Sequence, residues 1–173
     1  MKIQLRLTKD LYKGILADLA RPHPYAAERV AFVFLKSGES ANGNRVVLAT
    51  EYMHVDDEHY IQDASVGASI NGSAIRQVMQ QILDTQQGAL HVHMHNHGGV
   101  PRLSSVDRVA LPKMAQDLRN IGAQFLNGFL LLSQDRAVST IWSEEGTPVE
   151  VENISVAGLP LFFLKKRIGG VRP

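Results

Sequence analysis

Residues 88–99 of this chain read GALHVHMHNHGG. Its alternating character between flanking glycines predicts a strand from Ala89 to His95. Histidines fall at alternate positions in it, and alternate side chains of a strand share one face. They are His91, His93, His95 and His97. Two neutral imidazoles at positions i and i+2 can hold one ion, each nitrogen at about 2.0–2.1 Å from it, so the segment predicts a metal site.

A serine and an aspartate follow the histidines at a spacing that suits the same site. A helix is expected to begin at Ser104 or Ser105, to be interrupted or restarted at Pro112, and to end at Gly122. Asp107 then lies in the first turn, where its carboxylate can turn back toward the strand. Two histidines and one carboxylate, with a fourth position for water, are typical of a catalytic zinc site. Ser104 and Asp107 also have the spacing of a capping box, which would only start the helix.

The remainder of the chain predicts a mixed β-sheet flanked by helices, in the α/β class. Apolar residues at helical spacing predict two more helices, and short apolar or alternating runs predict strands. The expected helices run from a cap at Thr8 to about Arg21, before Pro22 and Pro24, and from Asn71 to a stop at Gly88; the expected strands are Val30–Leu35, Arg45–Tyr52, a segment near Ser65–Ile70, Phe129–Leu132, Ala137–Trp142 and Val149–Val156. The expected order therefore begins with a helix, and 173 residues suit a single domain.

Composition narrows the classes of function. The chain has no cysteine, which excludes disulfides, thiolate zinc sites and cysteine nucleophiles and fits a reducing compartment. A formal net charge of +1 argues against a broad nucleic-acid-binding surface. No run approaches the roughly 18 apolar residues of a membrane span. We therefore expect a cytoplasmic protein that binds neither nucleic acid nor membrane.

Two motifs together resemble the JAMM zinc metalloproteases, the catalytic members of the MPN (JAB) family. His93-Met94-His95, followed after eight residues by Ser104-Ser105-Val106-Asp107, resembles the signature His-x-His-x7-Ser-x-x-Asp. Glu28, which ends Pro24-Tyr25-Ala26-Ala27-Glu28 before an expected buried strand, resembles the glutamate of that family. The order of elements is similar to the family's from about Lys9 to Trp142.

The motif departs from the family pattern in two places. The spacer after His95 is one residue longer than usual, and Asn96 stands where the family commonly has proline. If His95 and His97 were the ligands, the spacer would be one residue short, and strand alternation cannot decide between the two pairs. His93 and His95 are preferred, because residues 89–92 then supply the strand that leads into the motif and the Gly98-Gly99 loop can absorb the insertion.

The resemblance implies a single MPN (JAB, cytidine-deaminase-like) domain, with a core at about 9–142 and a C-terminal extension at 143–173. It implies one zinc ion held by His93, His95 and Asp107, Glu28 as the general base, and Ser104 as the hydrogen-bond donor to the oxyanion. The implied substrate is a ubiquitin-like protein, cut after its C-terminal glycine from a conjugate or a precursor. The compact chain is similar to bacterial members encoded beside E1-like and E2-like enzymes, including those of antiviral conjugation systems. Another zinc amide hydrolase, a noncatalytic scaffold and a metal-storing or sensing protein remain alternatives.

Overall fold

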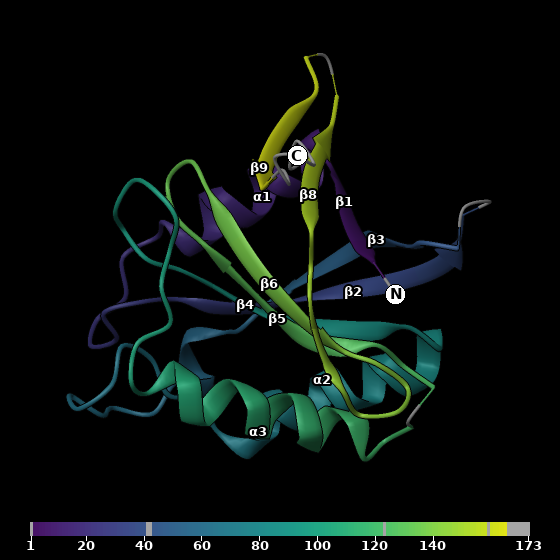
Figure 1. Ribbon diagram of the computed structural model, residues 1–173. Coiled ribbons are helices and arrows are strands. Elements are labelled where there is room, and N and C mark those ends of the chain that lie inside the picture. The colour runs from purple at the N-terminus through teal and green to yellow at the C-terminus, as the bar shows by residue number, and fades with distance from the viewer. Residues whose placement is uncertain (1, 41–42, 123, 159, 166–173) are drawn as a thin grey trace.

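The computed structural model describes residues 2–40, 43–122, 124–158 and 160–165, so residues 166–173 of the expected extension lie outside the described residues. Within these ranges the chain forms three α-helices, a short 3-10 helix and a nine-stranded sheet (Figure 1). The elements are β1 (Ile3–Thr8), α1 (Lys9–Leu19), β2 (Val30–Glu39), β3 (Arg45–His54), η1 (Asp57–His59), α2 (Gly72–Thr85), β4 (Gly88–Met94), α3 (Asp107–Arg119), β5 (Asn127–Leu132), β6 (Ala137–Trp142), β7 (Pro148–Glu150), β8 (Asn153–Ala157) and β9 (Phe162–Lys165).

The sheet is mixed, as predicted. Its strand order is β7-β6-β5-β4-β2-β3-β1-β8-β9. β2 pairs antiparallel with β3 and β4, whereas β4 and β5 are parallel, as are β1 and β3. The sheet is curled, so that β9 at one end contacts β6 near the other, and the Lys165–Glu150 ion pair joins β9 to β7. β4, which carries the histidines, therefore lies well inside the sheet.

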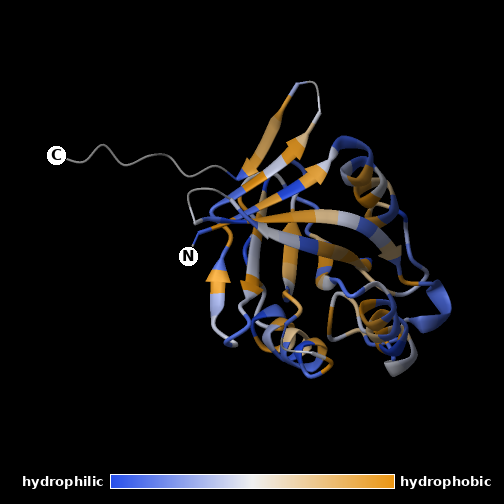
Figure 2. Cartoon of the chain, turned by 90° about the vertical axis from the view of Figure 1, so that its right-hand side faces the viewer, coloured by the Kyte–Doolittle hydropathy of each residue, from blue (hydrophilic) through white to orange (hydrophobic). Residues whose placement is uncertain are grey.

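Helices cover both faces of the sheet, which confirms the predicted sandwich. Successive side chains of β2 point to opposite faces. Phe32 and Phe34 pack in one core with α2 and α3, whereas Ala31 and Val33 pack in a second core with α1. Figure 2 shows the apolar residues concentrated on the strands and on the inward sides of the helices. This double burial explains why the first part of β2 is a continuous apolar run.

Three expectations about strands were wrong. The chain begins with a strand and not a helix: β1 pairs with β3 and β8, and its alternating Ile3, Leu5 and Leu7 are buried. Ser65–Ile70 is a loop in which only Ile70 forms a bridge, to Tyr60. Val149–Val156 is not one strand, because the chain leaves β6 after β7 and crosses to β1 as β8.

The end of α2 also differs from expectation. Gln86, with φ of 55°, caps the helix in the left-handed conformation, and Gly88 is the first residue of β4. Gly88 serves a close backbone approach, because a Cβ there would lie 1.9 Å from Leu126 O. Glycine at this position therefore belongs to the packing of β4 against the segment that enters β5.

We expect Gly88→Ala to lower the free energy of unfolding by about 1–3 kcal/mol or more, since backbone atoms must move to admit the methyl group. Urea denaturation measures this loss. Gly14→Ala is the matched control, because Gly14 is exposed within α1 and a Cβ there meets nothing within 4 Å. Alanine is the better helix former, so this control should raise stability by up to about 1 kcal/mol. Equal stability of the Gly88 variant and the wild type would contradict the close contact.

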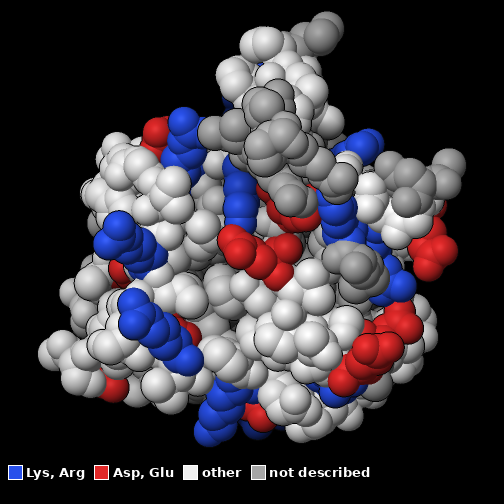
Figure 3. All heavy atoms as spheres, in the orientation of Figure 1, with Lys and Arg blue, Asp and Glu red and all other residues white. Residues whose placement is uncertain are grey.

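The surface adds two facts. On the face shown in Figure 3, basic and acidic side chains are interspersed. Among the described residues, no helix is long and apolar enough to cross a membrane.

Candidate metal centre

The register of the central strands brings Glu28 to the histidines. His93 in β4 lies opposite Val30 in β2. Glu28 precedes Val30 by two residues, so it lies just before the start of β2, beside the end of β4. His95 follows β4 directly, and its N–H donates to Leu132 O at 3.0 Å, which continues the pairing with β5. Residues far apart in sequence thus meet because β2 and β4 are antiparallel neighbours.

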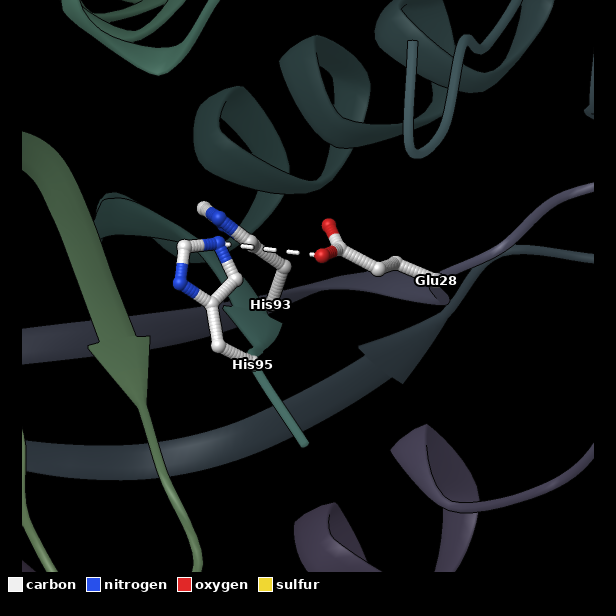
Figure 4. A group of neighbouring side chains, drawn as sticks. All are labelled: Glu28, His93 and His95. Carbon is white, nitrogen blue, oxygen red and sulfur yellow. Dashed lines mark ion pairs between the residues drawn. The ribbon is translucent and has the colours of Figure 1, made fainter. Parts of the chain in front are cut away.

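The three side chains form a group that could hold a metal ion. Figure 4 shows Glu28 directed toward the rings of His93 and His95. One ligand atom from each lies within 4.8 Å of those of the other two. His95 Nε2 lies 3.7 Å from Glu28 Oε1.

Asp107 joins this group from the start of α3. Its Oδ1 lies 3.3 Å from His93 Nε2, and its Oδ2 lies 3.6 Å from His95 Nε2. Two ligand atoms in a zinc tetrahedron, each about 2.0–2.1 Å from the ion, are separated by about 3.4 Å. Asp107 lies within 4.0 Å of both histidines, whereas Glu28 has such a contact with His95 alone among the described residues. The distances therefore favour Asp107 as the third ligand and leave Glu28 facing the open position.

The burial and hydrogen bonding of the His93 ring provide a second test of whether a metal ion suits this site. Its side chain is buried, with the residue 2% exposed, and neither Nδ1 nor Nε2 makes a hydrogen bond of good geometry in the described part of the chain, although Nε2 lies 3.3 Å from Asp107 Oδ1. Buried polar atoms are nearly always satisfied, because an unpaired one loses its hydration without compensation. A cation bound at Nε2 would supply the missing partner. The donor set, imidazole nitrogens with carboxylate oxygens, suits zinc.

Ser104 and Asp107 form the predicted capping box. The Ser104 N–H donates to Asp107 Oδ2 at 2.8 Å, and the Asp107 N–H donates to Ser104 Oγ at 3.1 Å. Burial raises the pKa of Asp107, but its contacts with His93 and Ser104 lower it by more, so this pKa lies well below its usual range. Asp107 is therefore ionised at neutral pH, and it both starts α3 and faces the histidines. The two interpretations of this motif are compatible.

The outer two histidines have different surroundings. His91 is 8% exposed and packs edge-on against Phe32, with ring centroids 5.5 Å apart. Burial and the neighbouring His93 lower the pKa of His91 to about 3, so it stays neutral. His97 is exposed, and its Nδ1 lies 2.9 Å from Gly98 O. The structure thus brings His93 and His95, not His95 and His97, to Asp107.

The long spacer after His95 is held by the turn between β5 and β6. The Gly99 N–H donates to Asp135 Oδ1 at 2.7 Å, and Ser133 Oγ donates to Gly99 O at 2.7 Å. The extra residue is therefore absorbed in an anchored surface loop. Sequence reasoning did not identify Asp135 or Ser133, whose role depends on the parallel pairing of β4 with β5.

A cavity of about 440 Å³ opens beside these side chains. Residues of the loop 65–70, of α3 and of β4 line it together with Val30. Its lining residues are Glu28, Val30, Ser65, Val66, Gly67, Ala68, Ser69, Ile70, His91, His93, His95, Ser104, Val106, Asp107, Ala110, Leu111 and Met114. Ser104 Oγ accepts a hydrogen bond from Asp107, which leaves its own O–H free to donate into the cavity.

The loop 65–70 is a part of the site that sequence reasoning missed. Gly67 O accepts hydrogen bonds from the N–H groups of Ala27 at 2.8 Å and Glu28 at 3.0 Å. A Cβ on Gly67 would lie 2.7 Å from Glu28 Oε2, so the loop backbone lies directly against the carboxylate. The glycine itself was the available signal, since an isolated glycine in an expected strand indicates a close approach of another group.

Comparison with known proteins adds no family to this description. A scan against models of protein families gives no match. A search of curated proteins by sequence gives no match either. The function proposed for the protein therefore rests on the geometry of its site and on the resemblance of its motifs.

Proposed function

We propose that the protein is a zinc-dependent isopeptidase or peptidase with an MPN (JAB) fold, which hydrolyses the bond after the C-terminal glycine of a ubiquitin-like protein. One observation carries the proposal: Glu28, His93, His95 and Asp107 come from three separate segments and converge in the lining of one cavity. A metal-storing surface needs no such cavity, and a noncatalytic scaffold needs no complete set of these groups.

The residues have distinct roles in the proposed reaction. His93, His95 and Asp107 hold the ion, which when bound supplies Lewis acidity that activates water near neutral pH. The Glu28 carboxylate accepts a proton from the attacking water and then delivers it to the leaving amine. The free O–H of Ser104 donates a hydrogen bond to the oxygen that gains negative charge during attack. Glu28 thus acts as both the general base and the general acid, and the Ser104 hydroxyl stabilises the developing negative charge.

The substrate and its partners follow from the motif resemblance. We propose a ubiquitin-like protein, free as a precursor or joined to a target, as the substrate, and E1-like and E2-like enzymes as the partners of the same conjugation system. A cytoplasmic bacterial protein of antiviral defence is the setting that this resemblance favours. A panel of ubiquitin-like proteins, each joined through Gly-Gly to a reporter or to a lysine side chain, tests the substrate class. We expect cleavage after the glycine by zinc-loaded protein and none after chelation.

The cavity supports a second candidate, another zinc amide hydrolase that acts on small molecules. Its volume of about 440 Å³ lies within the range of small-ligand sites, about 300–1,000 Å³. A panel of small N-acyl amino acids and amides distinguishes the two. If the protein hydrolyses small amides but leaves every ubiquitin-like fusion uncut, the small-molecule amide hydrolase replaces the isopeptidase as the proposed function.

We expect Gly67→Ala to lower kcat at least about tenfold with zinc content unchanged. The new methyl group would displace the Glu28 carboxylate, and misplacing a reacting group by about 1 Å can cost about 10²-fold. Steady-state kinetics and metal analysis of the purified variant measure both quantities. Gly98→Ala is the control, because a Cβ there meets Asp135 at an ordinary 3.8 Å. An unchanged rate in the Gly67 variant would show that the carboxylate does not depend on this contact.

A further inference from the structure

Arg29, the residue after Glu28, has a buried guanidinium, which is uncommon for a charged side chain. The residue is 3% exposed, and each of its three nitrogens donates a hydrogen bond. Nε donates to Arg21 O at 2.9 Å, Nη2 to Pro22 O at 2.9 Å and Nη1 to Asp57 Oδ1 at 2.7 Å. Arg29 therefore links its own segment, which follows Glu28, to two others. These are the chain just after α1 and the start of η1.

A buried histidine closes the turn that precedes Glu28. The His23 side chain is 1% exposed, and its Nδ1 accepts hydrogen bonds from the N–H groups of Tyr25 at 3.3 Å and Ala26 at 3.1 Å. Because Nδ1 accepts, the ring proton is assigned to Nε2, which lies 3.9 Å from Asp57 Oδ1. Hydrogen bonds from its own backbone to the enclosed ring thus hold this turn, while the ring's Nε2 makes no hydrogen bond in the described part of the chain.

The backbone on either side of Glu28 is also fixed. Gly67 O accepts from the Glu28 N–H at 3.0 Å. The Val30 N–H donates to the Tyr60 hydroxyl at 2.9 Å, and that hydroxyl donates to Val30 O at 3.2 Å. Arg29 is the residue between these two anchors, and it does not line the cavity. Its hydrogen bonds therefore act on the proposed chemistry indirectly, and Glu28, the preceding residue in the chain, is the nearest route.

We propose that Arg29 is a positioning residue whose three hydrogen bonds hold the Glu28 carboxylate at the metal centre. This inference rests on the proposed catalytic role of Glu28. The ion-pair partner Asp57 is 54% exposed at its side chain, so replacing Arg29 leaves no buried carboxylate without a partner. The hydrogen bond from Arg29 also lowers the pKa of Asp57, which keeps the pair charged at neutral pH.

The kinetic test compares Arg29→Gln, Glu28→Gln and the double variant, all loaded with zinc. We expect Arg29→Gln to lower kcat about 10- to 100-fold, with KM changed less than about twofold, because a carboxylate misplaced by about 1 Å can cost about 10²-fold. The double variant should be no slower than Glu28→Gln within about threefold, since a residue that acts through Glu28 has nothing left to position. Arg29→Lys keeps the charge for Asp57 and should recover part of the rate.

Amide hydrogen exchange supplies a readout that needs no turnover. The N–H groups of Ala27 and Glu28 should exchange at least about tenfold faster in Arg29→Gln than in the wild type. Arg45→Gln is the matched control, because Arg45 pairs with Glu144 at 3.0 Å and lies beside the far end of β2. That end is about 30 Å from the site, at about 3.3 Å per residue of strand. Exchange at the two amides should be unchanged in the control.

Two results would overturn the proposal: wild-type kcat together with wild-type exchange in Arg29→Gln, or additive losses in the double variant, which would show a role independent of Glu28. Should Arg29→Gln fail to fold, Arg29→Lys carries the same measurements. If the wild type cuts none of the substrates, the proposed function fails on its own. The exchange rates then still decide whether Arg29 holds Glu28 in place.

Discussion

Glu28→Gln is expected to slow hydrolysis at least about a hundredfold in a protein that still folds and holds zinc. A general base typically contributes about 10²–10⁴-fold to the rate. Glutamine keeps the shape and reach of the side chain but cannot accept the proton. Asp107 lies within 4.0 Å of both histidines and Glu28 of His95 alone among the described residues, which is why we expect the metal to remain. Steady-state kinetics on a Gly-Gly fusion, with metal analysis of the same sample, measures the effect.

Glu145→Gln is the control for this experiment, because Glu145 is exposed in the turn between β6 and β7. It should hydrolyse the fusion at the wild-type rate. Wild-type turnover by zinc-loaded Glu28→Gln would defeat the catalytic assignment even with the metal site intact. Loss of zinc together with activity would make Glu28 a ligand, as its place in one group with His93 and His95 permits.

His95→Ala is expected to weaken zinc binding by more than about a hundredfold. The ring lies between the two carboxylates, with Nε2 3.6 Å from Asp107 Oδ2 and 3.7 Å from Glu28 Oε1. Loss of a group that merely supports a ligand costs about 10–100-fold in metal affinity, so loss of a ligand should cost more. Competition with a chromogenic chelator gives the affinity. The rise in melting temperature that zinc gives the wild type should disappear with it.

His97→Ala is the matched control, since its ring is exposed and lies against Gly98 O. This variant should keep wild-type zinc affinity. Equal losses in the His95 and His97 variants would instead favour the other ligand pair. Full zinc occupancy in His95→Ala would remove the proposed site altogether.

The sequence could predict the parts of this protein that depend on local pattern. The two-residue period of β4 places His91, His93 and His95 on one face whatever surrounds them. The run from Val30 to Leu35 is apolar at every position, which already indicates a strand covered on both faces. Ser104 and Asp107 have the spacing of a helix start, and α3 begins at Asp107, although it runs through Pro112 where an interruption was expected. Each of these inferences needs only neighbours within a few residues.

The missed features depend on partners that are distant in sequence. The alternation of Ile3, Leu5 and Leu7 fits a strand, but β1 is formed only by its pairing with β3 and β8, which are distant in sequence. The local sequence of residues 65–70 predicts a strand. In the structure, however, Gly67 O accepts hydrogen bonds from the N–H groups of Ala27 and Glu28 and not from a neighbouring strand. The alternation of a strand cannot decide between the two histidine pairs, and the preference for His93 and His95 rests instead on the strand before them and on the Gly98-Gly99 loop.

The reciprocal hydrogen bonds between Ser104 and Asp107 have an evolutionary consequence. Asp107 is useful to α3 without any metal, because its carboxylate caps the helix and suits the positive end of the helix dipole. A descendant that exchanged His93 and His95 for apolar residues would lose the proposed chemistry but keep the start of the helix. The same fold could then persist as an inactive binding protein, and Asp107 would be retained after the proposed activity was lost. Retention of Ser104 and Asp107 in a related sequence is therefore no evidence of activity unless the histidines accompany them.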